Sequence, residues 1–465
     1  MKRTPLAPVL AVSLVAALAA TLSGRPAWPV DTVEVLSGSH EEAASTRNGD
    51  SQPGRDPELD SSRIISQARV RDITRRVDRP RQGLGAFSHT WGDSLVFDKN
   101  SDGNPDVLLS FHEQPWEIWL GKRRGGFTFD RSLPSTDRHN CAAADFAGPA
   151  STRPDGRPDL YCVRGANIGT VSHKKNALLI QQRDGGFKNV VASWGAKDPS
   201  GRGRTVSILN IRGTGRPSLF VGNAEPVLHP SRDRIFVNHG RRFVGRRTGG
   251  LPSVQNTSCS STGDFDLDGR QDFLSCSYSL RLYRNRTTPD GPVSYREVAA
   301  LQGLPARRWN DAGLVDLNRD TWPDLVTLSR TKLVVRLNSQ EPPHFPQADF
   351  RFPLSAGRSF CSGRANRDLA TDLLVVQGLA SPTDRRQRRD WMLINSGAGN
   401  QFRALPVPQP PTRNRRNGNG DTCSAIPGYR GTRAAWTISN GMLIPRQGQR
   451  GLLRRGYRQL VILAR

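Results

Sequence analysis

Short apolar runs alternate with polar, turn-rich stretches from about residue 95 to the C-terminal end of the chain. The clearest runs are residues 107–110, 116–120, 160–163 and 177–180. Runs of this length, bounded by Gly, Pro, Asn and Asp, are typical of β-strands. No sustained helical period occurs outside the N-terminal segment. The pattern therefore predicts an all-β fold.

Between two such runs, three aspartates stand at alternate positions: Asp264, Asp266 and Asp268, followed by Gly269 and Asp272. Counted from Asp264, the carboxylates occupy positions one, three, five and nine. That arrangement suits a hard cation that needs six or more oxygen ligands, with the carbonyl of Arg270 completing the sphere. A divalent cation would also relieve the repulsion between the carboxylates. We therefore expect a structural Ca²⁺ in this loop.

An EF-hand begins in a similar way, but it needs a bidentate Glu at position twelve and a helix on each side. Position twelve is Ser275, and the flanking residues 273–278 and 280–283 have the pattern of strands. The loop is therefore expected to join two antiparallel strands. The alternative for each such loop is an ordinary Asp/Gly turn without a metal ion.

The same loop recurs along the chain. Residues 98–106 and 316–324 match it, the latter with Thr321 in place of the glycine, and another copy begins at Asp145 and ends with residues 155–159 after an insertion. Degenerate copies begin at residues 210, 364 and 426, so successive copies start 47 to 65 residues apart. Such a period is typical of a propeller or a related array. The expected metal ligands are Asp98, Asn100, Asp102, Asp106, Asp145, Asp155, Asp159, Asp264, Asp266, Asp268, Asp272, Asp316, Asn318, Asp320 and Asp324.

These loops, D-x-[DN]-x-D-G-x-P-D followed by Leu/Val-rich strands, resemble FG-GAP/VCBS repeats. Residues 282–285 (Leu-Tyr-Arg-Asn), 295–298 and 303–305 are similar to the link between such repeats. The resemblance implies the fold of integrin α-subunits and many secreted bacterial proteins, a seven-bladed β-propeller of four-stranded antiparallel blades, over residues 85–465. Similar proteins bind glycans or other proteins through the loops at one end.

The N-terminal segment has the pattern of a secretory signal. Lys2 and Arg3 precede an apolar stretch of about a dozen residues. Small residues up to Ala27 offer cleavage sites. Residues 1–27 are expected to be a signal peptide, with an uncleaved membrane anchor as the alternative. Residues 28–84 are polar and poor in aromatics, so a disordered linker is expected there. The predicted location is extracellular or periplasmic, without a stable membrane anchor.

The chain has six cysteines, an even number that favours disulfides in a secreted protein. Cys141 and Cys162 flank the loop that begins at Asp145, and Cys259 and Cys276 flank the loop that begins at Asp264. Cys361 and Cys423 occupy matching positions in consecutive repeats. We predict the disulfides Cys141–Cys162, Cys259–Cys276 and Cys361–Cys423. A thiolate metal site is disfavoured because the chain has no C-x-x-C pair.

A formal net charge of +25 raises the affinity of the chain for polyanions. No helix-turn-helix pattern, zinc-finger spacing or RNA-binding signature is present, so nucleic acid is not an expected partner. The expected partners are acidic glycans, cell-wall polymers or extracellular proteins, and the chain is expected to be a monomer. The alternative is a merely solvated basic surface.

No sequence motif of a known catalytic site is present, so the chain is not expected to be an enzyme. His89, His139 and His173 could share a face with Asp93 or Asp137, although lone loop histidines are usually polar surface. The predicted function is a secreted, calcium-stabilised binding or scaffold propeller. The alternative is a polysaccharide lyase or hydrolase on the same fold, which would need an Arg/His/Tyr cluster at one end of the channel.

Overall fold

The structure is a computed structural model. It describes residues 70–72, 94–109, 115–134, 136–147, 155–165, 176–213, 215–224, 232–246, 251, 256–276, 278–366, 368–378, 388–407, 420–428, 435–440, 443–445, 452–454 and 459–464. The chain divides into two units, Met1–Val30 and Asp31–Arg465, and every described residue belongs to the second. The predicted signal peptide, 1–27, therefore lies outside the described residues.

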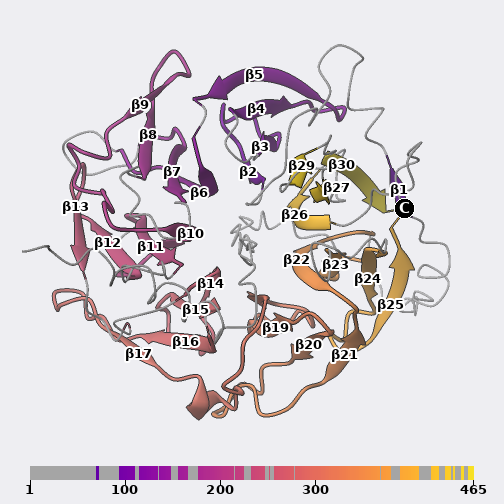
Figure 1. The fold of residues 1–465 in the computed structure, drawn as a ribbon. Helices are drawn as coiled ribbons and strands as arrows, with labels where there is room; N and C mark the ends of the chain where they lie inside the picture. The colour runs from indigo at the N-terminus through magenta and orange to yellow at the C-terminus, as the bar shows by residue number, and fades with distance from the viewer. Residues whose placement is uncertain are drawn as a thin grey trace, which may run out of the picture. The chain divides into compact units, whose positions relative to one another are not determined.

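Six blades each consist of four consecutive antiparallel strands (Figure 1). The first three blades are β2 (Leu95–Phe97), β3 (Asp106–Leu109), β4 (Trp116–Gly121) and β5 (Phe127–Leu133); β6 (Arg138–Ala144), β7 (Asp159–Arg164), β8 (Ala177–Gln181) and β9 (Phe187–Asn189); and β10 (Gly203–Leu209), β11 (Ser218–Asn223), β12 (Arg234–Asn238) and β13 (Phe243–Arg246). The next three are β14 (Cys259–Gly263), β15 (Asp272–Cys276), β16 (Leu280–Asn285) and β17 (Tyr295–Glu297); β18 (Asp311–Val315), β19 (Asp324–Leu328), β20 (Lys332–Arg336) and β21 (Phe350–Pro353); and β22 (Gly357–Gly363), β23 (Asp372–Gln377), β24 (Trp391–Asn395) and β25 (Phe402–Pro406). A 3₁₀ turn, η1 (Ala300–Gln302), follows β17.

A further four-stranded sheet, the closing sheet, is assembled differently. It holds β26 (Gly420–Ile426), β27 (Ala435–Asn440), β30 (Gln459–Ala464) and β1 (Val70–Asp72), in the order β1-β30-β27-β26. The hairpin β28 (Leu443–Pro445) and β29 (Leu452–Arg454) lies between β27 and β30 in the chain. The fourth strand therefore comes from the N-terminal side of the propeller.

The first strands of the sheets form the inner ring of the propeller. β2 packs against β6, β6 against β10, and so on to β22, and β26 contacts both β22 and β2. This arrangement closes the circle seen in Figure 1. Closure leaves each sheet packed against two neighbours, so both faces of the inner strands are buried.

The prediction of an all-β propeller with four-stranded antiparallel blades is confirmed, but seven equivalent blades are not found. Six blades follow the repeat, whereas the closing sheet departs from it. The loop copy at residue 426 has no carboxylates, and the β28–β29 hairpin separates the second strand from the third. The expected disordered linker, 28–84, is also wrong for residues 70–72, because they form β1 and pair with β30.

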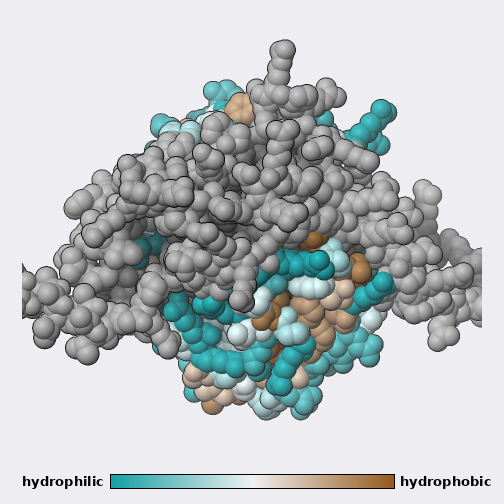
Figure 2. Space-filling view, turned by 45° about the vertical axis from the view of Figure 1, so that its right-hand side comes forward, coloured by the Kyte–Doolittle hydropathy of each residue, from teal (hydrophilic) through white to brown (hydrophobic). Residues whose placement is uncertain are grey.

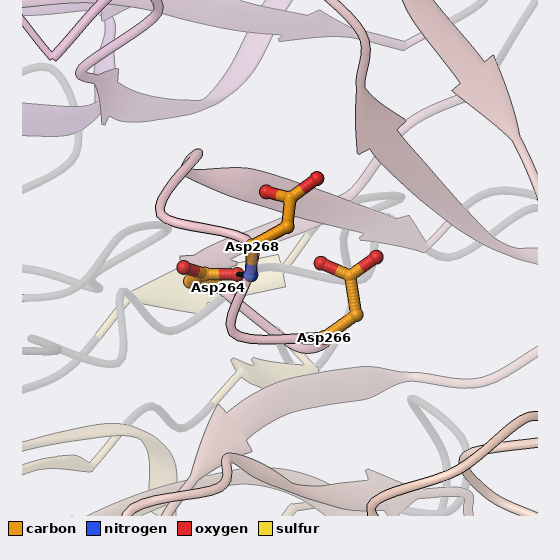
Figure 3. Close-up of side chains that lie close together, drawn as sticks. All are labelled: Asp264, Asp266 and Asp268. Carbon is orange, nitrogen blue, oxygen red and sulfur yellow. Dashed lines mark hydrogen bonds between the residues drawn. The ribbon is translucent and has the colours of Figure 1, made fainter.

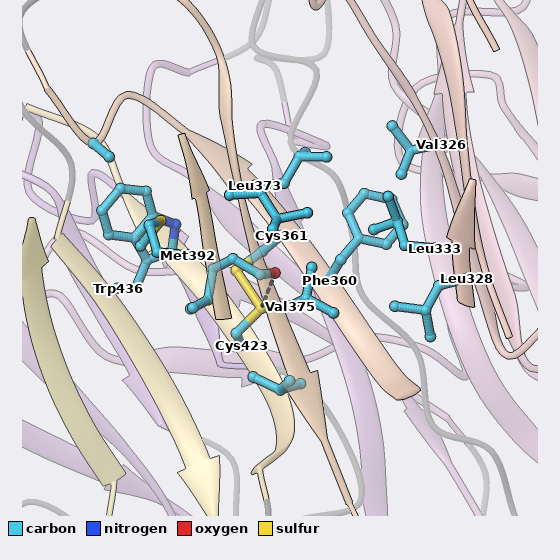
Figure 4. Close-up of a cluster of buried hydrophobic side chains, with 14 of the residues drawn as sticks. Val326, Leu328, Leu333, Phe360, Cys361, Leu373, Val375, Met392, Cys423 and Trp436 are labelled. Carbon is cyan, nitrogen blue, oxygen red and sulfur yellow. Dashed lines mark hydrogen bonds between the residues drawn. A yellow bond between two sulfur atoms is a disulfide. The ribbon is translucent and has the colours of Figure 1, made fainter. Parts of the chain in front are cut away.

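The six cysteines pair as predicted, in Cys141–Cys162, Cys259–Cys276 and Cys361–Cys423. The first two connect directly opposed residues of the first and second strands of a blade. The third connects β22 to β26 and thereby ties the sixth blade to the closing sheet. It lies among buried apolar side chains, including Met392 and Trp436 (Figure 4). The junction between the sixth blade and the closing sheet therefore has both a covalent and an apolar connection.

Candidate functional site

The fourth loop, residues 264–272, joins β14 to β15 and gathers its first three aspartates. One carboxylate oxygen from each of Asp264, Asp266 and Asp268 lies within 4.8 Å of the others (Figure 3). Asp264 fixes the turn, because its oxygens accept hydrogen bonds from the backbone N–H groups of Asp268 (3.1 Å) and Gly269 (2.8 Å). Gly269 has φ of 80°, in the left-handed region that glycine adopts without strain. The backbone thus holds three carboxylates around one turn.

Arg284 of β16 compensates part of this negative charge. Its Nε lies 2.6 Å from Asp266 Oδ2, and its Nη2 donates to Asp268 Oδ2 at 3.1 Å. Burial, together with the neighbouring carboxylates, nevertheless raises the pKa of Asp264 and of Asp266. The second oxygen of Asp266, Oδ1, is buried and has no hydrogen-bond partner. An unpartnered carboxylate oxygen beside two further carboxylates is a donor set that fits Ca²⁺.

Three other loops repeat the framework of the fourth. Asp98 accepts hydrogen bonds from the N–H groups of Asp102 and Gly103, and Asp316 accepts from those of Arg319 and Thr321. In the second loop Gly156 donates to Asp145, so residues 155–159 complete the turn despite the insertion, as the sequence predicted. Within the part of the chain that the structure describes, only the fourth loop brings three acidic side chains together.

The loops differ at position three. Asn100 and Asn318 stand where the fourth loop has Asp266, and their side-chain amides donate to Asp102 (3.1 Å) and Asp320 (3.0 Å). These two loops therefore carry one carboxylate fewer around the turn. The degenerate sixth loop has the same contact, from Asn366 to Asp368.

The aspartates at position nine turn away from the loops and into the blades. Asp272 is fully buried, and its two oxygens accept hydrogen bonds from the backbone N–H groups of Phe265 (3.2 Å) and Asn285 (2.7 Å). The same pair of contacts, to the second loop residue and to a residue at the end of the third strand or up to two residues after it, recurs at Asp106, Asp159, Asp324 and Asp372. Burial raises the pKa of all five, to about 6 for Asp106, about 7 for Asp159, Asp324 and Asp372, and about 8 for Asp272. Each of these carboxylates holds the base of a loop.

A set of asparagines that the sequence analysis did not single out connects neighbouring blades. Asn285 donates to the carbonyl of Ile211 (2.9 Å), Asn338 to that of Phe265 (2.8 Å) and Asn395 to that of Leu317 (2.7 Å). In each case the acceptor is the second residue of the preceding blade's loop. The sequence signal was present, because an asparagine follows an apolar third strand each time. Loop geometry and blade packing are therefore coupled.

A polar cluster occupies the opposite end of the inner strands. His139 of β6 lies 3.0 Å from Asp137 and within 2.8 Å of the Arg204 guanidinium of β10, and all three side chains are buried. Both strands carry a β-bulge at this point, as do β22 and β26. Bulges redirect side chains and are frequent beside active sites. His139 and Asp137 thus lie together as expected, whereas His89, His173 and Asp93 lie outside the described residues.

A hollow lies on the loop side of the second and third blades. It has a volume of about 700 Å³, and its lining includes Arg157, Arg183, Lys188, Arg241 and the half-buried Trp194. Two aspartates also line it, Asp155, which pairs with Arg157, and the exposed Asp184. Within the described residues, no carboxylate forms an ion pair with the other three basic side chains. The hollow therefore combines an aromatic wall with an excess of positive charge.

Buried aspartates make the exterior of the protein more basic than its composition indicates. Ten described aspartates are buried, against four described basic residues. The buried residues are Asp106, Asp137, Asp159, Asp198, Asp233, Asp272, Asp311, Asp324, Asp372 and Asp390, and Lys99, Arg138, Arg204 and Arg336. On the face shown in Figure 2, hydrophilic residues cover most of the described surface. Among the described residues, no helix has the length and apolar character needed to cross a membrane.

Comparison with solved structures finds matches of low similarity. Crystal structures of BBS1N in complex with ARL6DN, soaked with lead or with mercury, match at 10% and 11% identity with a TM-score of 0.47. Each match covers 83% of this chain and 96% of the other. No family model and no curated protein matches the sequence.

Proposed function

We propose that the chain is a secreted, calcium-stabilised propeller that binds an acidic polysaccharide. The hollow beside Trp194 carries the proposal. An indole face can stack on a sugar ring, and Arg183, Lys188 and Arg241 would neutralise its carboxylate or sulfate groups. Charge of one sign concentrated in a concave site also raises the local concentration of an anionic ligand.

We further propose that the chain is a divergent FG-GAP/VCBS-type propeller and that the closing sheet acts as its seventh blade. Support comes from the recurring aspartate framework and from β26, which packs on both neighbours. Calcium would bind to the fourth loop through Asp264, Asp266 and Asp268, supplying a charge that Arg284 offsets only in part. Its role would be structural, because the loop is tied to the next blade through Asn338 and the carbonyl of Phe265.

The test is binding of the purified chain to polygalacturonate, with neutral dextran and an acidic protein as comparison ligands. We expect salt-sensitive binding to polygalacturonate only, strongly weakened by Arg183→Glu/Arg241→Glu. The matched control is Arg123→Glu/Arg330→Glu, which removes the same charge at exposed positions outside the hollow. Binding of the acidic protein alone, or equal losses in both double variants, would contradict the proposal.

A second candidate, a polysaccharide lyase or hydrolase, is favoured by one observation. The Asp137–His139–Arg204 cluster brings an acid, an imidazole and a guanidinium together at one end of the inner strands. A carboxylate-oriented histidine can act as a general base, and a guanidinium can stabilise a developing anion. Release of reducing ends from polygalacturonate by the wild-type chain, abolished in His139→Gln, would establish this candidate instead.

A further inference from the structure

A second, smaller cavity lies between the first and second blades. Its volume is about 340 Å³, and three arginines, Arg131, Arg138 and Arg164, contribute to its lining. Among the described residues, no aspartate or glutamate lines it. The remaining wall is largely apolar and includes Leu133, Leu179 and Phe187.

Arg138 is the most unusual of the three, because its side chain is almost entirely buried, with 2% exposed. Nη1 donates to the carbonyl of Pro134 at 2.6 Å, while Nε is buried without a hydrogen-bond partner. Among the described residues, no carboxylate forms an ion pair with this guanidinium. A buried cation without an anionic partner loses much of its solvation free energy, and a bound anion would compensate for that loss.

Arg164 stands directly opposite Arg138 on the neighbouring strand. Among the described residues, its buried Nε has no hydrogen-bond partner, and the charge of Asp137 acts on its guanidinium. Asp137 is itself engaged with His139. Burial, reinforced by Arg164, lowers the pKa of Arg138 to about 10. Two like charges side by side in a half-enclosed cavity destabilise the empty state.

The physical chemistry of the cavity defines its ligand. The guanidinium groups of Arg138 and Arg164, which both line the cavity, suit the planar, bidentate geometry of a carboxylate. The apolar wall excludes a small hydrated ion and favours a ligand with a hydrophobic body. We propose that this cavity binds a small organic carboxylate whose anionic head lies between Arg138 and Arg164 and whose apolar body contacts Leu179 and Phe187. The site is separate from the hollow beside Trp194 and does not depend on its function.

The experiment is isothermal titration calorimetry of the full chain with benzoate, with benzyl alcohol, sulfate and inorganic phosphate as comparison probes. Benzyl alcohol retains the ring without the charge, and the inorganic ions retain the charge without the ring. The variants are Arg164→Met and Arg138→Met, with Arg123→Met as the matched control, because Arg123 is exposed and lines neither this cavity nor the hollow beside Trp194.

We expect benzoate to bind, the other probes to bind at least about tenfold more weakly, and both cavity variants to lose about tenfold or more in benzoate affinity. The control variant should bind as the wild type does. Arg164 is half-buried beside a like charge, so the melting temperature of Arg164→Met should be unchanged or raised.

Three results would overturn the proposal: no benzoate binding to the wild type, equal affinity for benzyl alcohol, or tighter binding of phosphate or sulfate than of benzoate. Undiminished binding in Arg164→Met would also exclude the site. If Arg138→Met does not fold, Arg164→Met decides the question alone, since no hydrogen bond from the Arg164 side chain to another described residue is lost in that variant.

Discussion

Substitution of Asp272 separates the two roles that an aspartate at position nine can have. As a metal ligand, Asp272 would matter only when calcium is bound. In the structure, both of its oxygens instead accept backbone hydrogen bonds, from Phe265 and Asn285. Asp272→Asn keeps one acceptor but places an NH₂ group against the second N–H. We therefore expect it to destabilise the protein with and without calcium.

The magnitude follows from that single lost contact. A buried donor left without its acceptor costs about 1–3 kcal/mol in the free energy of unfolding. Urea unfolding in calcium and in excess chelator measures the cost in both states. Asp268→Asn is the control. Asp268 is one of the three clustered loop aspartates, so its carboxylate should matter mainly when calcium is present. A cost for Asp272→Asn that disappears in chelator would refute the structural role.

Three further predictions concern stability. Thr321 has φ of 72° where three other loops have glycine, so Thr321→Gly should stabilise the protein by roughly 0.5–1 kcal/mol, whereas Gly269→Ala should destabilise it, in urea unfolding. Asn395→Ala removes donors to two carbonyls and an acceptor for two N–H groups, so it should cost at least about 3 kcal/mol, and a cost below about 1 kcal/mol would deny the blade connection. Burial raises the pKa of Asp233 to about 7, so the folded state retains a proton that the unfolded state loses near pH 4. Because of this carboxyl, the free energy of unfolding should fall as pH rises towards 7, by at most about 1.4 kcal/mol per pH unit. Asp233→Asn keeps the contacts to Asn223 and Thr257. In this variant, the free energy of unfolding measured in chelator from pH 4 to 8 should lose that part of its pH dependence, and an unchanged pH dependence would exclude Asp233 as its source.

Much of the fold could be predicted because short stretches of sequence are enough to recognise the repeat. Apolar runs, aspartate loops and the position of each cysteine relative to a loop suffice for the strands of a blade and for the disulfides. The closing sheet could not be predicted in the same way. Its β1 strand is three residues long in a polar segment, and only its pairing with β30 distinguishes it from a linker.

The candidate sites show more clearly what the spacing of residues in the sequence cannot predict. An aspartate closes five of the loops, those ending at residues 106, 159, 272, 324 and 372, yet spacing does not reveal that its oxygens face the backbone. The arginine pair at Arg138 and Arg164 is invisible in the sequence, because the two residues become neighbours only when β6 pairs with β7. The burial of ten aspartates likewise depends on packing, and it decides which charges remain outside.

We propose that calcium bound in the fourth loop stabilises the propeller. The most direct measurement is a thermal melt of the wild-type chain and of Asp264→Asn/Asp268→Asn, each in calcium and in excess chelator. Saturation at about a hundred times the dissociation constant would stabilise the folded state by about 2.7 kcal/mol. We predict a higher melting temperature in calcium for the wild type and no such difference in the double variant. The same melting temperature for the wild type in calcium and in chelator would show that the loops are ordinary turns.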